Sequence, residues 1–412
     1  MSAPLHEPPP ALLKRTLTLS YVVLYGLGVT VGAGIYVLVG EVITRSGDFA
    51  PTSFLIAGLV MLLPAACFAE LTGRMPYAAA EAHFVGTGFR SPTMFLLVGL
   101  GVAAVGLVSS AAIAHGAVGY LSQLVDLPAT ALLTLVIIAT GLVAGIEIRN
   151  SIAAAGLLTV IEIGGLFCIV IGSIWSGNDL GTQAIKAVPT SLSPAVWTGI
   201  AASSLLAFFA FIGFEDIDSI AEETINPQKT LARGIFITLF LTIAIYIVVI
   251  LAALAAVPIS EIAGQKAPLA VVFAKTTPFS PLVITLIAII ATVNGIIVQL
   301  IMSARVLYGL ANRGSLPKVL ARVNPTTNTP LVATALSVVV VLGLALAFPI
   351  AQLAEWTSAI TLVIFILVCA ALILIKRQDT PIPEGTFVVP AWVPYGGIMA
   401  CTALLAAGWL AG

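Results

Sequence analysis

The sequence predicts an all-α polytopic membrane protein with about 11 transmembrane helices. Of its 412 residues, 60% are hydrophobic and only 8% are charged, and the mean hydropathy is +1.14. A typical soluble domain carries about 25% charged residues, so the polar residues here are too few to cover a soluble core. The second observation is a series of long apolar stretches, since about 20 apolar residues suffice to span a bilayer.

Eleven stretches have the length of a membrane span. They cover residues 19–44, 51–71, 92–123, 128–147, 150–176, 194–223, 231–256, 279–308, 330–348, 352–375 and 391–410. Proline marks the start of several of them, where its missing N–H is tolerated. Between these stretches, we expect a short interfacial helix at 77–89 and a longer loop with partial helix at 259–277.

The Lys and Arg residues orient the chain, because cytoplasmic loops of membrane proteins are enriched in both. With a cytoplasmic N-terminus, most of the 17 fall on the inner side. The outer side receives only Arg45, Lys186, Lys266 and Lys275. We therefore expect a multi-pass protein of the cell (inner) membrane with its N-terminus in the cytoplasm and, after eleven spans, an external C-terminus. The net charge of −1 gives no indication of nucleic-acid binding.

The first stretch contains an unusual density of glycine at its centre. The segment GVTVGAGIYVLVG, residues 28–40, places three glycines and Thr30 within seven residues, although glycine in a helix interior costs about 1 kcal/mol relative to alanine. One interpretation is helix packing, because Gly28 and Gly32 form a small-xxx-small face. The other is an unwound segment whose backbone groups line a cavity.

The sixth stretch is interrupted in a corresponding place. In AFFAFIGFEDIDSIAEE, residues 207–223, the apolar run passes Gly213 and meets three acidic residues before any loop. Two halves of five spans each, an odd number, would insert with opposite topology, and paired discontinuous helices are typical of inverted-repeat transporters. The sequence therefore favours unwinding over packing and predicts a 5+5 inverted-repeat fold in which helices 1 and 6 are discontinuous.

This repeat predicts the organisation of the chain. The expected parts are a cytoplasmic tail (1–18), a first five-helix repeat (19–176), a second, inverted five-helix repeat (194–375), and a loop with one additional transmembrane helix (376–412). The cysteines and histidines lack the spacing of metal ligands, and no nucleotide-binding loop is present. We therefore expect no cofactor, no metal and no catalytic residues.

Unwound helices would create a binding site from backbone groups. The half-helix after Gly34 would direct N–H groups and the positive end of its dipole at the membrane midplane, which suits a carboxylate. Carbonyl groups released around 209–212 would suit an ammonium group. Together the two breaks match the backbone of an α-amino acid.

Three segments resemble the amino acid–polyamine–organocation (APC) transporter superfamily. They are VGAGIY at 31–36, FFAFIGFEDI followed by AEETINPQKTLARGI within 208–235, and SARVLYGLANRGSLPKVLARVNPTTNTP at 303–330. The resemblance implies a leucine-transporter-like 5+5 fold that works by alternating access. It places the substrate carboxylate at Gly32, Ala33 and Gly34 with Thr30 nearby, and the ammonium group at Phe209, Ala210, Ile212 and Gly213. Phe209 would cap the site as a gate.

Glu162 is the only ionisable residue in the centre of the fifth stretch. It lies about 18 Å along a helix from Asn150, at a depth comparable with that of Gly32. A lone carboxylate there costs about 3 kcal/mol on insertion scales, so such a group tends to be protonated and to exchange its proton when the cavity fills. Proton coupling, contact with a cationic ligand and a structural hydrogen bond are three hypotheses for it. In proton-coupled relatives the resemblance implies a lysine at this place.

Other polar residues are secondary candidates. Asn294 and Gln299 suit an interhelical hydrogen bond as well as a ligand contact, and Ser303 lies nearer the inner side. An inner, water-filled vestibule paired with nearby Lys or Arg is expected around Glu215, Asp216 and Asp218. A solvated gate network is expected from Glu222, Glu223, Lys229 and Arg233, with Glu70 and Arg74 as possible members.

The leading functional hypothesis is secondary transport of an amino acid or related amine, coupled to protons or to a counter-substrate. The alternative is a cationic amino acid/polyamine antiporter. A channel would predict a continuous polar face along several helices, and a membrane enzyme would predict clustered His, Asp or Cys; neither pattern is present. Sodium coupling is less favoured because Ser303 is the only nearby hydroxyl on span eight. The substrate and the oligomeric state are not determined by the sequence.

Overall fold

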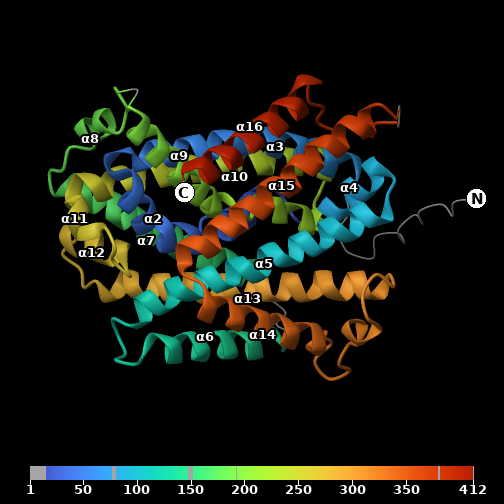
Figure 1. Cartoon of the computed structure of the whole chain (residues 1–412), viewed down its shortest axis with the longest axis horizontal. Helices are drawn as coiled ribbons and strands as arrows, with labels where there is room; N and C mark the ends of the chain where they lie inside the picture. The colour runs from blue at the N-terminus through green and yellow to red at the C-terminus, as the bar shows by residue number, and fades with distance from the viewer. Residues whose placement is uncertain (1–14, 77–79, 147–151, 192, 379–380, 412) are drawn as a thin grey trace, which may run out of the picture.

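The computed structural model is helical throughout the part of the chain that it describes. This part comprises residues 15–76, 80–146, 152–191, 193–378 and 381–411. The one β-bridge described joins Leu17 to Thr224. The long helices run side by side along the long axis of the molecule (Figure 1), and each satisfies its backbone hydrogen bonds internally, as lipid requires. The prediction of an all-α polytopic membrane protein is confirmed.

Each predicted span coincides with helical structure. The first contains α1 (Leu19–Thr30) and α2 (Ala33–Ser46), and the sixth contains α9 (Pro194–Phe208), η2 (Phe209–Phe211) and η3 (Phe214–Glu223). The others are α3 (Ala50–Arg74), α5 (Pro92–Leu121), α6 (Ala129–Ala144), α7 (Ile152–Trp175), α10 (Pro227–Ala256), α13 (Leu282–Asn312), α14 (Leu331–Ala347), α15 (Ile350–Lys376) and α16 (Trp392–Ala411). By length and composition, 8 helical stretches of the described chain could cross a membrane. This number is lower than the eleven predicted spans because α2 and α3 join through η1 (Gly47–Phe49) into one stretch, and because α1, α6 and α14 are shorter than a full span.

Short helices lie at the two ends of this bundle. α4 (Ala80–Phe89) lies at one end, and α8 (Leu180–Lys186), α11 (Ile259–Ile262) and α12 (Pro268–Thr276) lie at the opposite end (Figure 1). The interfacial helix expected at 77–89 is present from Ala80, and residues 77–79 lie outside the described chain. Lys186 and Lys275 share one end of the bundle, as the predicted topology requires.

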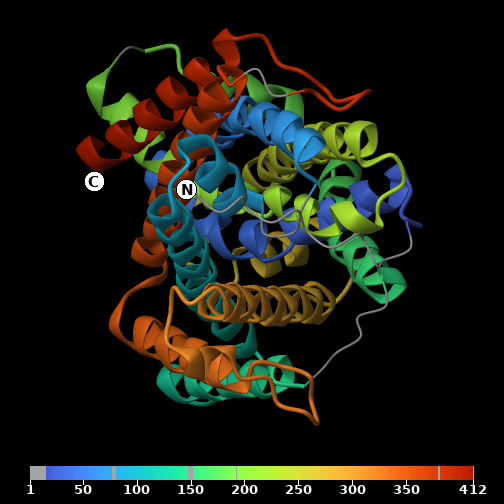
Figure 2. The ribbon, with the colours of Figure 1, turned by 90° about the vertical axis from the view of Figure 1, so that its right-hand side faces the viewer.

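The two interrupted helices lie at the centre. α6 and α14 pack against each other and against α13, and these three helices form a layer along one side of the molecule (Figure 2). α5 packs on α13 and on α15. α1 packs against α7 and α10, while α2 packs against α9. The first and sixth spans therefore meet inside the bundle, away from the surface that would contact lipid.

The first helix break lies at Val31 and Gly32. The Val31 N–H donates to the Leu27 carbonyl over 2.7 Å and completes α1. Gly32, at φ −62° and ψ −122°, leaves the helical region, and α2 begins at Ala33. The predicted interruption of the first span is confirmed, but it lies slightly earlier in the sequence than the predicted Gly32–Gly34. Ala33 and Gly34 already belong to the first turn of α2.

The second helix break lies at Ile212 and Gly213. Ile212 is extended, with ψ 137°, and Gly213 has φ +119°, a region that side-chain-bearing residues rarely adopt. After it, the chain continues as the 10-residue 3-10 helix η3, although 3-10 runs longer than about four residues are uncommon. The sequence predicted this interruption but not the change of helix type.

Candidate functional site

The backbones of the two helix breaks touch. A Cβ atom placed on Gly34 would lie 2.7 Å from the Cα atom and 3.1 Å from the Cβ atom of Ala210. No side chain fits there without displacing backbone, so only glycine permits this approach of α2 to η2. The predicted carboxylate end and ammonium end of the site are thus brought together by the fold.

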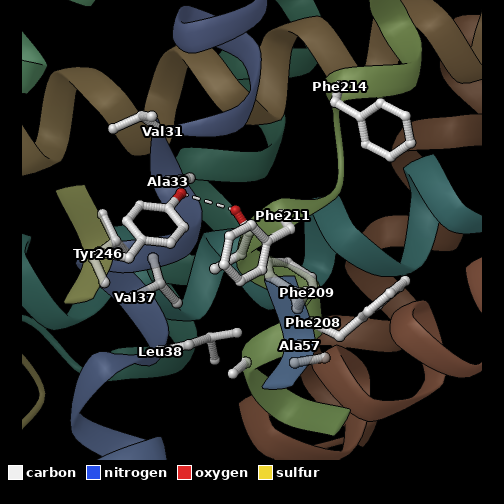
Figure 3. Packing of buried hydrophobic residues seen from close by; sticks show 14 of the residues in the cluster. Val31, Ala33, Val37, Leu38, Ala57, Phe208, Phe209, Phe211, Phe214 and Tyr246 are labelled. Atoms are coloured by element: carbon white, nitrogen blue, oxygen red, sulfur yellow. Dashed lines mark hydrogen bonds between the residues drawn. The ribbon is translucent and has the colours of Figure 1, made fainter. Parts of the chain in front are cut away.

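Tyr246, on α10, links the two breaks and was not identified from the sequence. Its hydroxyl lies 2.7 Å from the Thr30 carbonyl oxygen and 2.8 Å from the Ala210 carbonyl oxygen. A phenol has one proton, so the hydroxyl donates to either carbonyl or shares the proton between them. Figure 3 shows the side chain between α2 and Phe211, whose ring centroid lies 5.2 Å away from that of Tyr246. Tyr246 therefore satisfies carbonyl groups released by both breaks.

This arrangement changes the expected role of the sixth-span carbonyls. The Ala210 carbonyl accepts from Tyr246, and the Phe209 carbonyl accepts from the Ile212 N–H over 3.2 Å. In this conformation both therefore already have a protein donor. A ligand ammonium group would compete with Tyr246 for the Ala210 carbonyl, which the sequence-based hypothesis did not include.

Glu162 lies beside the first break. Its Oε2 atom is 3.6 Å from the position of a Cβ on Gly32, which confirms that the two residues share a depth. The side chain is 2% exposed, and its Oε1 atom has no hydrogen-bond partner among the described residues. The hydroxyl of Thr30 is also buried, and it has no hydrogen-bond partner among the described residues. Two unused polar groups, one of them ionisable, therefore flank the break.

Two tyrosines fix the backbone around Glu162. The Tyr36 hydroxyl donates to the Glu162 carbonyl oxygen over 2.7 Å, which ties α2 to α7. The Tyr120 hydroxyl donates in turn to the Tyr36 carbonyl oxygen over 2.9 Å. The backbone position of Glu162 is thus set by α2 and α5, while its carboxyl group stays without a fixed partner among the described side chains.

A cavity adjoins the sixth-span break. The cavity is lined by Glu81, Val102, Val105, Gly106, Ile212, Glu215, Asp216, Gln299, Met302, Ser303, Thr361, Ile364 and Phe365. These residues come from α4, α5, α13, α15 and the segment around Gly213. Of the secondary candidates, Gln299 and Asp216 line it, and Asn294 and Asp218 do not. Ser303 lines it while its hydroxyl donates to the Ala103 carbonyl oxygen over 3.3 Å.

Carboxyl groups dominate the polar lining of this cavity. The Glu215 Oε2 atom accepts from the Gly213 N–H over 2.9 Å, so an acidic side chain stabilises the break itself. The expected pairing of Glu215 and Asp216 with Lys or Arg is not found among the described ion pairs. Glu81, on the short helix α4, was missed by the sequence reading because α4 was assigned to the interface. Burial raises the pKa of Glu81 above its ordinary value.

Among the described ion pairs, Glu70 is paired with Arg74 and Lys376 and not with Lys229 or Arg233. The Glu70 Oε1 atom lies 2.7 Å from Arg74 Nη2, and its Oε2 atom lies 2.8 Å from Lys376 Nζ. The Val389 N–H donates to the same carboxylate over 2.8 Å. Glu70 is fully buried, so this cluster ties α3 to α15 and to the segment before α16. The side chain of Glu222 lies outside the described part.

These features define a multi-pass membrane protein with two interrupted helices in contact at its centre. The chain belongs to the amino acid permease family, whose model matches residues 16–412. The expected membership of the APC superfamily is thereby confirmed. The family consists of transporters, and no catalytic family is indicated.

Several characterised proteins are similar to the chain. The vacuolar cationic amino acid transporter 2 of Arabidopsis thaliana is 30% identical, over 90% of this chain and 62% of its own length. The branched-chain amino acid permease BcaP of Bacillus subtilis is 26% identical, over 97% of this chain and 89% of its own. The methylthioribose transporter of the same species is 26% identical, over 92% and 84%. The chain thus spans less than two thirds of the plant relative.

Proposed function

We propose that the chain is a secondary active transporter of an amino acid or a closely related amine. The observation that carries this proposal is the contact between Gly34 and Ala210, which joins the N-terminal end of α2 to the interrupted sixth span. The free N–H groups and positive dipole end of α2 suit a carboxylate. The printed names of the relatives, a cationic amino acid transporter and a branched-chain amino acid permease, point to the same substrate class.

Transport would proceed by alternating access in a 5+5 inverted-repeat fold. Interrupted helices in the first and sixth places are typical of such transporters. α1 and α2 are separate rigid segments joined at Val31 and Gly32, so one half can tilt while the other stays packed. In this proposal the N-terminus is cytoplasmic, and the end with α8, α11 and α12 is external.

Glu162 is the proposed coupling group. A buried carboxyl group with an unused oxygen beside Gly32 holds its proton while the break is closed, because burial disfavours the charged form, and can release the proton when water reaches the break. This cycle would link substrate movement to a proton gradient. Exchange of one substrate for another is the alternative mode and requires no net proton transfer.

One observation favours a cationic substrate as the second candidate. Glu81, Glu215 and Asp216 line the same cavity, and no Lys or Arg is among the described residues that line it. A substrate with a second positive charge would compensate these carboxylates. The cavity opens beside Ile212, so the side chain of an amino acid bound at the breaks would point to it.

Uptake into proteoliposomes tests the proposal. A panel of radiolabelled amino acids and amines would be offered with and without an inward proton gradient, and with and without internal amino acid. Saturable uptake that is stimulated by either condition supports the proposal, and the ranking of L-arginine against L-leucine separates the two substrate candidates. Non-saturable flux would contradict the proposal, whereas uptake that depends only on a sodium gradient would contradict proton coupling and leave secondary transport in place.

A further inference from the structure

Two buried threonines of α10 depart from the usual arrangement of buried helical threonines in the described chain. Thr140, Thr276, Thr292, Thr357 and Thr361 each donate their hydroxyl to the carbonyl group four residues earlier. Thr238 and Thr242 are fully buried, yet their hydroxyls have no hydrogen-bond partner among the described residues. Both hydroxyls are therefore available to a molecule that is not part of the chain, such as water.

These threonines share one face of α10 with Tyr246. The three residues are four positions apart, and such positions lie one above another on a helix. Thr238 faces α1, because its hydroxyl lies 2.6 Å from the position of a Cβ on Gly26. Tyr246 contacts both helix breaks through its hydroxyl. The row of Thr238, Thr242 and Tyr246, here called the hydroxyl row, thus runs from the breaks along α1.

The hydroxyl row connects Glu162 to one end of the bundle. Glu162 lies beside Gly32, and its helix α7 packs against α10, which carries Tyr246. In the other direction the row leads toward the start of α10, the end at which Thr224 pairs with Leu17. There the Tyr25 hydroxyl lies 3.1 Å from the half-buried Ser219 hydroxyl.

We infer that the hydroxyl row, with intervening water molecules, carries protons between Glu162 and the end of the bundle at which α10 begins. This inference rests on the proposed role of Glu162 as the coupling group. The Cα atoms of successive residues in the row are about 6 Å apart along the helix axis, and one water making two hydrogen bonds bridges about 5.6 Å between hydroxyl oxygens. Each hydroxyl accepts a proton from one neighbour and passes its own to the next. No residue of the row therefore gains a net charge.

Among the ionisable groups around α10, Glu162 is the acid at the helix breaks, where the hydroxyl row begins. The start of α10 itself carries Lys229 and Arg233, and the helices packed against α10 bring Glu162 on α7, Tyr25 on α1, and Glu215, Asp216, Asp218 and Glu223 on η3. α3 brings Glu70 and Arg74, which pair with each other. α12 brings Lys275, which pairs with Glu261, and α8 brings the exposed Lys186. Asp216 and Asp218 lie at the far end of the row, where a proton would enter or leave.

Valine substitutions test the hydroxyl row. Thr238→Val and Thr242→Val keep the side-chain shape and remove hydroxyls that have no partner in the described chain, so thermal stability should be unchanged or slightly increased. Uptake of radiolabelled L-leucine or L-arginine driven by a proton gradient should fall by about tenfold, the effect of about 1.4 kcal/mol on a barrier. Exchange of the same probe at equal pH should be retained. Thr242→Ser, which keeps the hydroxyl, should restore gradient-driven uptake.

Two control variants make the outcomes distinguishable. Thr140→Val removes a hydroxyl on α6 that donates within its own helix, and it should leave both assays unchanged. If Glu162→Gln loses gradient-driven uptake while the double variant Thr238→Val/Thr242→Val retains it, the row is not the proton route and the proposed function stands. If Glu162→Gln itself retains gradient-driven uptake, the proposed coupling role fails, and the inference fails with it.

Discussion

Gly34 and Ala210 bring the two interrupted helices into backbone contact, with only 2.7 Å between the position of a Cβ on Gly34 and the Cα atom of Ala210. A ligand held by both breaks must therefore fit between segments that already touch. Binding would require α2 and η2 to separate, or would place the ligand to one side of this contact, next to Ile212 and the acidic cavity. The contact thus makes the relative position of the breaks sensitive to a single methyl group.

Gly34→Ala should reduce substrate binding at least tenfold without unfolding the protein. The added methyl group pushes against the backbone of Ala210, and overpacking of this kind costs about 1–3 kcal/mol. Gly34→Leu should abolish binding. Substrate affinity in detergent, measured together with the melting temperature, would show this. Gly343→Ala is the matched control, because a Cβ there meets nothing within 4 Å; wild-type affinity of Gly34→Ala would contradict the account.

Tyr246→Phe should slow transport more than it lowers stability. The variant keeps the ring that packs on Phe211 but leaves the Thr30 and Ala210 carbonyls without their donor, at a cost of about 1–3 kcal/mol. Initial rates of exchange, compared with substrate affinity, are the measurement. Tyr21→Phe serves as the control, since Tyr21 is 48% exposed. Unchanged rates would mean that Tyr246 has no part in positioning the breaks.

The sequence predicted the helix breaks but not what holds them together. Glycine and acidic residues interrupt an apolar run, which is a local signal, and Glu162 stood out as a charge within a span. Tyr246 is one aromatic residue among many in an apolar helix, and its partner Thr30 is 216 positions away in sequence. Its spacing of four from Thr242 and Thr238 was the one available signal.

The Glu70 cluster shows the same limit. Arg74 lies four residues from Glu70, a spacing that a helix brings together, and that contact could be anticipated. Lys376 and Val389 approach Glu70 only because α3 and α15 pack together, since Val389 is 319 positions away from Glu70 in sequence. The same reason explains Glu81, which reaches the cavity through the packing of α4 and not through any motif.

Glu70→Gln should destabilise the folded protein by about 3–5 kcal/mol, because it leaves Arg74 and Lys376 without their buried counter-charge. Thermal unfolding in detergent is the measurement. Glu261→Gln removes an exposed partner of Lys275 and should cost no more than about 1 kcal/mol. Equal melting temperatures for the two variants would show that the buried cluster does not support the fold.

The proposed orientation predicts which loops an impermeant reagent reaches. In a cysteine-free background, Lys186→Cys should react with an impermeant maleimide in intact cells, because α8 lies at the proposed external end. Lys318→Cys, on η4 (Lys318–Ala321), should react only after permeabilisation. Both side chains are exposed, so a difference reports the side of the membrane and not burial. The reverse pattern would invert the topology.

Glu162→Gln tests the central claim most directly. Glutamine keeps the volume and hydrogen-bonding capacity of the side chain but cannot titrate, so the variant tests only the gain and loss of a proton at this position. The measurement compares uptake driven by a proton gradient with exchange at equal pH, in the same proteoliposomes and with the same radiolabelled amino acid. The account predicts that exchange persists while gradient-driven uptake is lost. Gradient-driven uptake at the wild-type rate would contradict it, and weakened binding in both assays would instead make Glu162 a contact for a cationic substrate.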